Sequence, residues 1–391
     1  MYPHQAERLA AALERHRLDA LIAAAPANIA YLTGFSSLAR RVYPTQETYA
    51  VVTRDATALV VPTIDLLAVL ESDVDVNHLA CHGRFHLDVE QARGETARRF
   101  AALVSEPAPT AGEALVEVLR RLGVGAGRLG LDDAHTPAAT AAALHHALRG
   151  YSVESGSEAL ATARLIKSPF ELDALQRALH VAEEAINVVL ALLAPGITER
   201  EAAEAFEREI IAQGARPYCT IVAFGAGSAV PAPWPTDRAL RVGDLVRFDL
   251  GCSVKGYHSD VARMAVMGEP TERQQGMFDA IHAGLEAALD VIRPGVTGAA
   301  VFEAAVTATR KAGLARFDRH HVGYGIGLEP AEPPPLAPGV SSALEMGMAL
   351  RVETPYYVVG ETGLNVKETV VVTRTGCQPM NRSHRGLVVL D

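Results

Sequence analysis

The 391-residue chain is 49% hydrophobic and has a formal net charge of −10 at pH 7. The length exceeds that of one ordinary domain and predicts two, and the negative charge argues against nucleic acid or an anionic membrane as a partner. Apolar runs such as 185–194 are too short to span a bilayer. The N-terminal residues lack the basic and apolar regions of a signal peptide, and the four cysteines lack CxxC spacing. We therefore expect a cytoplasmic protein without nucleic-acid or membrane partners, a disulfide framework or a zinc knuckle.

The first part of the chain alternates strand and helix patterns. The expected elements are, in chain order, a strand at 18–24, a helical turn at 27–32, strands at 48–53 and 57–61, a strand at 130–132 and a helix at 137–148. The dipeptide Arg54-Asp55 indicates a hairpin between the second and third strands. The Gly- and Ser-rich segment 150–157 is interpreted as a linker. It divides the chain into domains at 1–156 and 157–391.

The second part of the chain carries a duplicated pattern. Capping boxes, which mark helix starts, occur at 168–171, 198–201 and 271–274. Pro-Gly-Ile-Thr at 195–198 recurs as Pro-Gly-Val-Thr at 294–297, and each helix pair precedes a hairpin, at 244–264 and at 348–373. Pro-Gly is common punctuation, so the repeat has an accidental explanation, but the shared order of elements favours duplication. We expect a pseudo-twofold α/β (α+β) domain with helices on one side of the sheet.

The first hairpin places two carboxylates together. If its turn lies at 253–256, Asp249 and Asp260 are equidistant from the centre and lie directly opposite each other. Opposed carboxylates repel, which favours a metal ion or a basic side chain between them. The alternative is an exposed acidic pair, but apolar residues flank Asp249 and favour burial.

The second hairpin pairs opposite charges. Glu353 and Lys367 are equidistant from Gly360, a plausible turn residue, and are expected to face each other. An exposed cross-strand ion pair of this kind contributes little to stability, which is the simpler interpretation. By the internal symmetry, however, this pair occupies the place of Asp249 and Asp260. Three carboxylates and one ammonium group are then expected to converge.

Several motifs resemble those of the prolidase, aminopeptidase P and creatinase family, the pita-bread enzymes. They are Arg-Leu-Ile-Lys-Ser-Pro at 164–169, Gly-Asp-Leu-Val-Arg-Phe-Asp-Leu-Gly at 243–251, Gly-Tyr-His-Ser-Asp at 256–260, and the pair 18–22 and 31–35. The resemblance implies an N-terminal creatinase-like α/β domain, a C-terminal pita-bread domain and a homodimer. It also implies a dinuclear Mn, Co or Zn site built from two aspartates, one histidine and two glutamates.

This chain departs from the implied ligand set. Asp249, Asp260 and Glu353 match three ligands, but Tyr324 stands at the histidine position and Lys367 at that of the final glutamate. Replacing a shared glutamate by lysine puts an ammonium group where a divalent ion would bind. We therefore predict an ammonium-filled centre without a tightly bound metal pair. If a metal does bind, we expect Mn, Co or Zn at the three carboxylates.

Two further family histidines are replaced, by Ala232 and Ala331, so that His320 is the usual active-site histidine that remains. We expect His320 to act as an acid or base, while the adjacent His321 points elsewhere if the segment is extended. His258 shares a strand face with one of the aspartates by period-two spacing and is expected to line the pocket.

Roles for the other predicted site residues follow from their chemistry. Glu353 is expected to hold a cationic group or water, and Tyr324 and Lys367 to stabilise an oxyanion, with Lys367 a base if desolvated. Asp249 and Asp260 are assigned to substrate binding. Lys367 as a structural counter-ion and Tyr324 as a packing residue are the alternatives.

Three functions remain open. We favour a metal-independent hydrolase that cleaves a C–N bond in a small amide, amidine or dipeptide-like substrate. The first alternative is an Xaa-Pro dipeptidase, a metallopeptidase with an unusual ligand set. The second is a non-catalytic binding protein that uses the old pocket.

Overall fold

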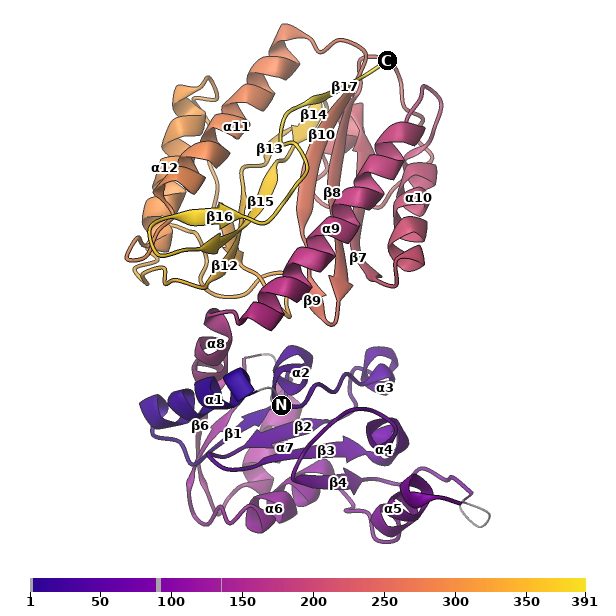
Figure 1. The fold of residues 1–391 in the computed structure, drawn as a ribbon, viewed down its shortest axis with the longest axis vertical. Coiled ribbons are helices and arrows are strands. Elements are labelled where there is room, and N and C mark those ends of the chain that lie inside the picture. Colours follow the sequence, from indigo (N-terminus) through magenta and orange to yellow (C-terminus); the bar gives the residue numbers. More distant parts are fainter. Residues whose placement is uncertain (1–2, 89–92, 135) are drawn as a thin grey trace. The chain divides into compact units, whose positions relative to one another are not determined.

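The computed structural model describes residues 3–88, 93–134 and 136–391, and it divides into two compact units, Met1–Arg164 and Leu165–Asp391 (Figure 1). The unit boundary falls a few residues after the linker predicted at 150–157. None of the described helices has the length and apolar content to cross a membrane.

The first unit is a six-stranded mixed sheet with helices, in the strand order β4-β3-β2-β1-β5-β6. Its strands are β1 Ala20–Ala23, β2 Tyr49–Val52, β3 Thr57–Pro62, β4 His78–His82, β5 Arg128–Leu131 and β6 Ser152–Ser155. Strand β2 runs antiparallel to β1 and β3, and the other pairs are parallel. The predicted strands and hairpin of this unit are confirmed.

The helices of this unit include the two expected from the sequence. They are α1 Pro3–His16, α2 Pro26–Thr33, α3 Leu38–Val42, α4 Thr63–Leu70, α5 Glu95–Val104, α6 Ala111–Arg121, α7 Ala138–Ala147 and α8 Ser157–Leu165, which crosses the unit boundary. The linker prediction for 150–157 is wrong, because β6 pairs there with β5 and Gly156 donates a backbone hydrogen bond to Leu131. This polar segment forms an edge strand because it pairs in parallel with β5. Its composition alone did not indicate a strand.

The second unit repeats a pair of helices followed by strands. Its helices are α9 Pro169–Leu192, α10 Glu199–Ala212, α11 Glu272–Val291 and α12 Gly298–Lys311, with a short 3₁₀ helix η1 at Gly225–Ala229. The three predicted capping boxes all form, at Ser168, Thr198 and Thr271. Each satisfies two backbone N–H groups that a helix start leaves without an intrahelical partner.

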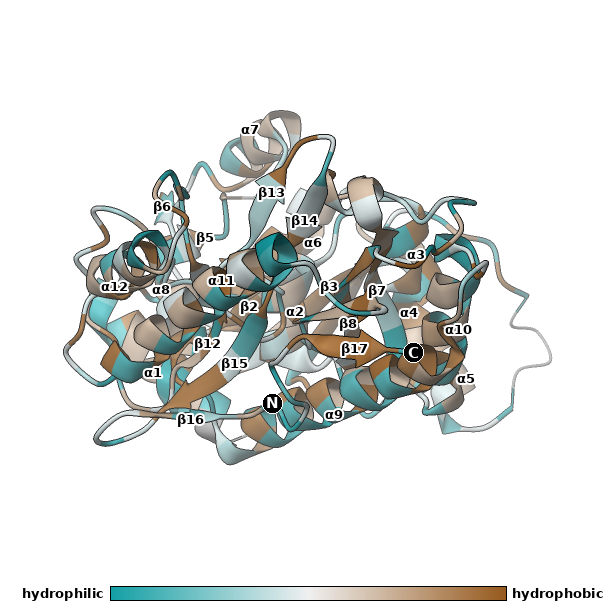
Figure 2. Ribbon diagram, turned by 90° about the horizontal axis from the view of Figure 1, so that it is seen from above, coloured by the Kyte–Doolittle hydropathy of each residue, from teal (hydrophilic) through white to brown (hydrophobic). Residues whose placement is uncertain are grey.

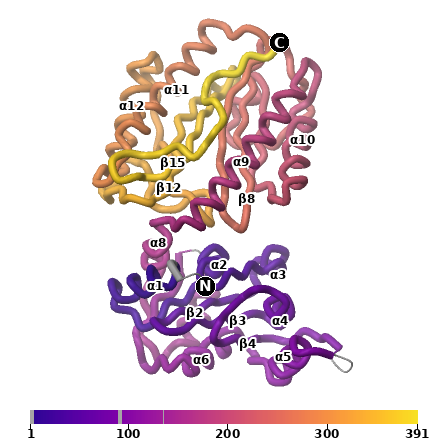
Figure 3. The backbone as a smooth tube through the Cα atoms, in the orientation of Figure 1, coloured from indigo at the N-terminus to yellow at the C-terminus, as the bar shows by residue number. Residues whose placement is uncertain are grey.

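The strands of this unit form a five-stranded and a four-stranded sheet, in the orders β17-β10-β8-β7, with β9 beside β8, and β11-β12-β15-β16. The first contains β7 Arg216–Phe224, β8 Leu245–Val254, β9 Tyr257–His258, β10 Val261–Met267 and β17 Val388–Leu390. The second contains β11 Gly323–Gly325, β12 Ala349–Glu353, β15 Lys367–Val372 and β16 Cys377–Pro379, and a separate pair consists of β13 Tyr356–Val358 and β14 Thr362–Leu364. Figure 3 traces the C-terminal segment to the sheet edge, where β17 pairs with β10.

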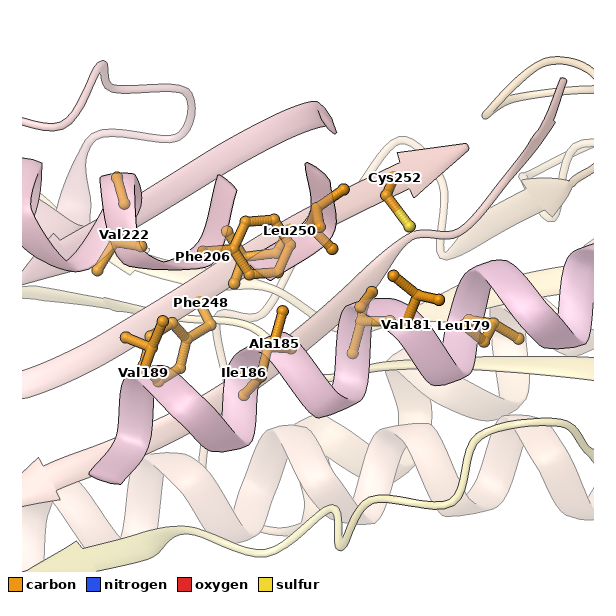
Figure 4. Packing of buried hydrophobic residues seen from close by; sticks show 14 of the residues in the cluster. Leu179, Val181, Ala185, Ile186, Val189, Phe206, Val222, Phe248, Leu250 and Cys252 are labelled. Carbon is orange, nitrogen blue, oxygen red and sulfur yellow. The ribbon is translucent and has the colours of Figure 1, made fainter. Parts of the chain in front are cut away.

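Helix α9 packs its apolar face on the first of these sheets. In Figure 4, Val189 of α9 lies beside Phe248 of β8, Leu250 of β8 lies beside Phe206 of α10, and all four side chains are buried. In Figure 2 the ribbon of α9 changes between hydrophilic and hydrophobic colours along its length, whereas that of β17 is hydrophobic throughout. This packing fixes β8, which carries one of the predicted site aspartates.

The first hairpin differs in register from the prediction. Asp249 pairs with Ala262, so it lies diagonally across from Asp260 and not directly opposite it. The turn consists of Lys255 and Gly256, whose φ angles of 51° and 83° are both positive, as in a two-residue hairpin turn of type I′. The prediction assumed a four-residue turn, so the predicted register differs from the observed register by two residues. A shift of two residues keeps both carboxylates on the same face of the sheet. In the second hairpin the predicted pairing of Glu353 with Lys367 is confirmed.

Candidate functional site

The Lys367 ammonium lies among three carboxylates. Its Nζ donates to Asp249 Oδ1 at 2.6 Å and to Asp260 Oδ1 at 2.8 Å, and lies 3.5 Å from Glu353 Oε2. All four side chains are buried. They come from β8, β12, β15 and the segment that precedes β10, so the convergence depends on both sheets of the second unit.

Arg351 is a second cation in this centre, which the sequence analysis did not identify. Its Nη1 donates to Asp260 Oδ2 and lies 3.4 Å from Glu353 Oε2. Asn365 also contacts the carboxylates, because its Nδ2 donates a hydrogen bond to Asp249 Oδ2 at 3.0 Å. One feature of the sequence does indicate Arg351: it lies two residues from Glu353 on one strand, which places both side chains on the same face.

Two further arginines border the carboxylates. Arg247, which is fully buried, donates from Nη2 to the backbone oxygen of Val230 at 2.7 Å, and its Nη1 lies 3.7 Å from Asp249 Oδ2. Arg319 Nη2 lies 3.7 Å from Glu353 Oε1. Arg247 shares the face of Asp249 by period two, whereas Arg319 lies outside any strand and left no periodic signal.

The electrostatics of the centre favour the ionised forms of Lys367 and Glu353, whereas burial raises the pKa of Asp249 against the attraction of Lys367. Burial disfavours the Lys367 ammonium, but attraction by Asp249 and Asp260 outweighs it and raises the pKa of Lys367. Burial likewise disfavours the Glu353 carboxylate, yet the cations led by Lys367 and Arg351 lower the pKa of Glu353 to about 2. Lys367, Arg351 and Glu353 are therefore charged near neutral pH.

The prediction placed His320 in the centre and His321 outside it, and the structure shows the reverse. His321 is buried, with Nδ1 at 3.5 Å from Glu353 Oε1, whereas His320 is exposed and its ring contacts that of His321. Burial lowers the pKa of His321 to about 4, although Glu353 opposes this shift. The expectation that His321 points elsewhere is wrong, because residues 319–322 are not a strand and period-two alternation does not hold there.

Tyr324 lies at the border of this centre. It pairs across the strands with Arg351, whose guanidinium carbon lies 5.7 Å from the Tyr324 ring centroid. Its ring centroid is also 4.5 Å from that of His321. The half-buried tyrosine thus forms an aromatic wall beside two of the charged groups.

His258 and the two nearby cysteines lie to one side of the carboxylates. The His258 ring packs edge-on against Tyr218 with centroids 4.9 Å apart, and burial lowers the pKa of His258. Burial raises the pKa of Cys219 to about 12 and that of Cys252 to about 11, so neither thiol is a ready nucleophile. Cys252 is completely buried.

The donors present do not fit a pair of divalent ions. An ion bridging Asp249 and Asp260 would have to occupy the place of the Lys367 ammonium, which already binds both. Across the described ranges, no three His, Cys, Asp or Glu side chains are grouped as ligands for one ion. Positive charges at Lys367 and Arg351 would also repel a divalent cation in this buried setting.

Both parts of the chain match the models of known protein families. Residues 173–374 match the model of metallopeptidase family M24, and residues 5–166 match that of the creatinase/prolidase N-terminal domain. The chain is 30% identical over 236 residues to an uncharacterized peptidase, YqhT, of Bacillus subtilis, covering 60% of this chain and 67% of the relative. It is 29% identical to an Xaa-Pro dipeptidase of Pyrococcus horikoshii, covering 58% of this chain and 65% of the relative.

A solved structure, dipeptidase PepE from Mycobacterium ulcerans, superposes with a TM-score of 0.79 at 28% identity, covering 98% of this chain and 96% of the relative. The matches to the curated sequences span about two thirds of those proteins, whereas the structural match spans nearly the whole of both chains. This chain belongs to metallopeptidase family M24 and carries the creatinase/prolidase N-terminal domain that precedes the pita-bread fold.

Proposed function

We propose that this protein is a hydrolase that cleaves a C–N bond in a small dipeptide-like substrate without a metal pair. The observation that carries the proposal is the direct bonding of Lys367 Nζ to both Asp249 and Asp260. Membership of a peptidase family supports hydrolysis, and relatives named Xaa-Pro dipeptidase support a dipeptide-like substrate. The alternative of a metallopeptidase fits the family but requires the ammonium to leave both carboxylates.

The proposed acid–base group is His321, held by Glu353. Glu353 Oε1 lies 3.5 Å from Nδ1, and its charge opposes the burial that lowers the pKa of His321 to about 4, so the neutral imidazole is available to accept a proton. Glu353 itself is a weak base, because its pKa is about 2. His320 remains a second candidate for this role, since it lies against His321 at the exposed side.

Cations at the centre supply the electrostatic part of the proposed catalysis. Arg351 and Tyr324 lie side by side and are positioned to donate hydrogen bonds to an oxygen that gains negative charge. Lys367, Asp249 and Asp260 act as a rigid support in this scheme, because their charges are already paired with one another. His258 is proposed to line the substrate side.

A second candidate function is binding without catalysis. It is favoured by one observation, that cations already bond to each of the three carboxylates Asp249, Asp260 and Glu353. No carboxylate in this centre is then free to activate water.

Three other predictions from the sequence are retained as proposals. They are the domain boundary at 156/157, a homodimer and a cytoplasmic location.

The decisive experiment measures metal content and turnover together. We expect purified protein to hold far less than one equivalent of Mn, Co or Zn, before and after incubation with each ion. Cleavage of Xaa-Pro dipeptides or related amides is expected to survive a chelator, and to fall on substitution of His321→Ala.

Two equivalents of bound metal, or activity that a chelator abolishes and Mn or Co restores, would overturn the metal-free proposal. Absence of turnover across a broad amide and dipeptide panel, combined with saturable ligand binding, would favour the binding protein. Unchanged turnover in both His321→Ala and His320→Ala would remove the histidines from the scheme.

A further inference from the structure

A short strap of chain, residues 230–236, begins beside the charged centre. Arg247 donates from Nη2 to the backbone oxygen of Val230 at 2.7 Å and from Nη1 to that of Pro231 at 3.2 Å. The same Nη1 lies 3.7 Å from Asp249 Oδ2. One completely buried guanidinium group therefore joins the start of the strap to a carboxylate of the centre.

The other end of the strap is fixed by a buried carboxylate. Glu199 Oε2 accepts hydrogen bonds from the backbone N–H of Thr236 at 3.0 Å and from its hydroxyl at 2.6 Å. Arg200 donates its backbone N–H to the Thr236 oxygen at 3.0 Å. Both ends of the strap are thus hydrogen-bonded to regular elements, β8 and the first turn of α10, which limits the movement of the residues between them.

The middle of the strap carries an exposed tryptophan. Trp234 is 89% exposed and stands between Pro233 and Pro235. Each proline fixes its own φ angle, so the chain beside Trp234 has little conformational entropy to lose when the ring is covered. A single exposed apolar side chain is ordinary on a protein surface. This one differs because its backbone is held at both ends and one end lies at the centre.

The distance from the centre to Trp234 matches the size of a small ligand. Pro231 and Trp234 are three residues apart, which an extended chain spans in about 10 Å. An extended dipeptide is about 7 Å long, and its side chains add to that reach. A dipeptide whose polar groups are held at the centre therefore extends far enough to meet the indole ring.

We propose that Trp234 is a specificity-determining residue that packs on an apolar side chain of the bound substrate. The inference rests on the proposed function and deepens it, because it selects dipeptide-like substrates with a large apolar side chain over those with glycine. Burial of apolar surface against the indole supplies the preference. Glu199 and Thr236 are positioning residues in this scheme, since they hold the strap and do not touch the ligand.

The test compares three dipeptides that differ in the first side chain, glycyl-proline, leucyl-proline and phenylalanyl-proline. Binding to the full-length protein is measured by calorimetry, and KM replaces Kd for a probe that is turned over. Wild-type protein is expected to bind phenylalanyl-proline about tenfold tighter than glycyl-proline. Trp234→Ala is expected to reduce this ratio to about twofold or less without a change in kcat, and Trp234→Phe to retain most of it.

Fluorescence of the strap gives an independent measurement, because Trp234 is the only tryptophan of the chain. Phenylalanyl-proline is expected to shift the emission to shorter wavelength and to protect the indole from quenching by acrylamide. Thr236→Val removes the hydroxyl that donates to Glu199. It is expected to lower the fluorescence anisotropy, because the strap becomes more mobile, and to weaken the side-chain preference without a change in kcat.

The matched control is Val359→Ala, which truncates a 93% exposed apolar side chain in the turn between β13 and β14. It is expected to leave the preference and the tryptophan emission unchanged. Equal affinity of the wild type for the three probes would overturn the proposal, as would a Trp234→Ala variant, folded by circular dichroism, that keeps the full preference. An emission shift that follows protein concentration and not the dipeptide would assign Trp234 to a contact between copies of the chain, and would also overturn it.

Failure of this inference is distinguishable from failure of the proposed function. A side-chain preference with an emission shift but without turnover supports the role of Trp234 and contradicts hydrolysis. Turnover with a KM that is insensitive to both the first side chain and Trp234→Ala supports hydrolysis and contradicts the role of Trp234.

Discussion

Lys367 combines two properties that rarely coexist in one lysine, burial and full charge. Its relative exposure is 5%, and attraction by the surrounding carboxylates outweighs the burial that disfavours its charge. The cost of removing an ammonium from water is offset because two hydrogen-bonded carboxylates and a third nearby replace the solvent. The stability of the charged lysine and that of the carboxylates are therefore interdependent.

Substitution of Lys367→Met is expected to lower the free energy of unfolding by about 3–5 kcal/mol, because it leaves Asp249 and Asp260 buried without their shared cation. Urea denaturation followed by circular dichroism measures the change. The control is Lys311→Met at the exposed end of α12, where a change of about 0.5 kcal/mol or less is expected. Equal stability of Lys367→Met and wild type would contradict the arrangement of the centre.

Residue identity alone predicted part of this centre. Lys367 and Tyr324 were recognised because they stand at positions where the family motif expects metal ligands, and the spacing of Glu353 and Lys367 predicted their pairing. Arg319 and His321 were missed as members, because both precede β11 in an irregular segment. Such a segment has no period from which the direction of a side chain follows.

At the scale of the element, the C-terminal segment is tied to the back of the Lys367 strand. Glu183 of α9 accepts hydrogen bonds from the backbone N–H of Arg382 and from the backbone and hydroxyl of Ser383. Arg263 Nε donates to Ser383 Oγ at 2.9 Å, and its Nη1 donates to the backbone oxygen of Lys367 at 2.6 Å. Helix, C-terminal segment and strand are thus joined through one carboxylate and one guanidinium.

The Glu183 contacts predict a stability effect that depends on pH. Burial alone would raise the pKa of Glu183, but its hydrogen bonds to Ser383 and Arg382 lower it below the ordinary value of about 4.3. A depressed folded-state pKa stabilises the protein above the unfolded-state value, and this contribution is lost as pH falls through the folded value. Glu183→Gln is therefore expected to cost about 1–3 kcal/mol at pH 7 and progressively less below pH of about 4.

Urea unfolding at a series of pH values checks this expectation. Glu184→Gln, at the exposed neighbouring position on the same helix, is the control and is expected to change stability little at any pH. A cost for Glu183→Gln that stays constant between pH 7 and pH 3 would show that ionisation of Glu183 is unimportant for this anchor.

The turn of the first hairpin illustrates how a local choice sets the geometry of the centre. Lys255 and Gly256 both adopt positive φ, and this two-residue turn makes Ala262 the partner of Asp249. Asp260 then lies two residues from the opposed position, at a diagonal distance that Lys367 spans. The sequence predicted that both carboxylates share a face, but the exact turn residues were needed to fix the register.

On the scale of the whole molecule, the centre is assembled by the duplicated unit. Strands of the first sheet contribute Asp249 and Arg247, and strands of the second contribute Arg351, Glu353 and Lys367. Binding of a metal pair to native protein alone would stabilise it by mass action. In the metal-free proposal, the ion network occupies the positions where such a pair would bind.

We therefore expect Mn, Co or Zn to leave the melting temperature of the full-length protein unchanged. A metal bound to the native state at a hundred times its Kd would add about 2.7 kcal/mol, which differential scanning calorimetry readily detects. Titration with each ion, with chelator-treated protein as the baseline, provides the measurement. A rise in melting temperature that saturates with metal concentration would contradict the proposal that the ion network, and not a metal pair, occupies the centre.

The sequence by itself determined the duplication, the capping boxes, the strand hairpins and the family, because these depend on local periodicity and on contiguous motifs. Tertiary structure decided which charges surround the carboxylates. Arg319 meets Glu353 from a different segment and Lys367 meets Asp249 from a different sheet, and no local pattern records how two sheets bring such distant residues together. The net charge of a buried site is a property of that convergence, and it became apparent only from the assembled fold.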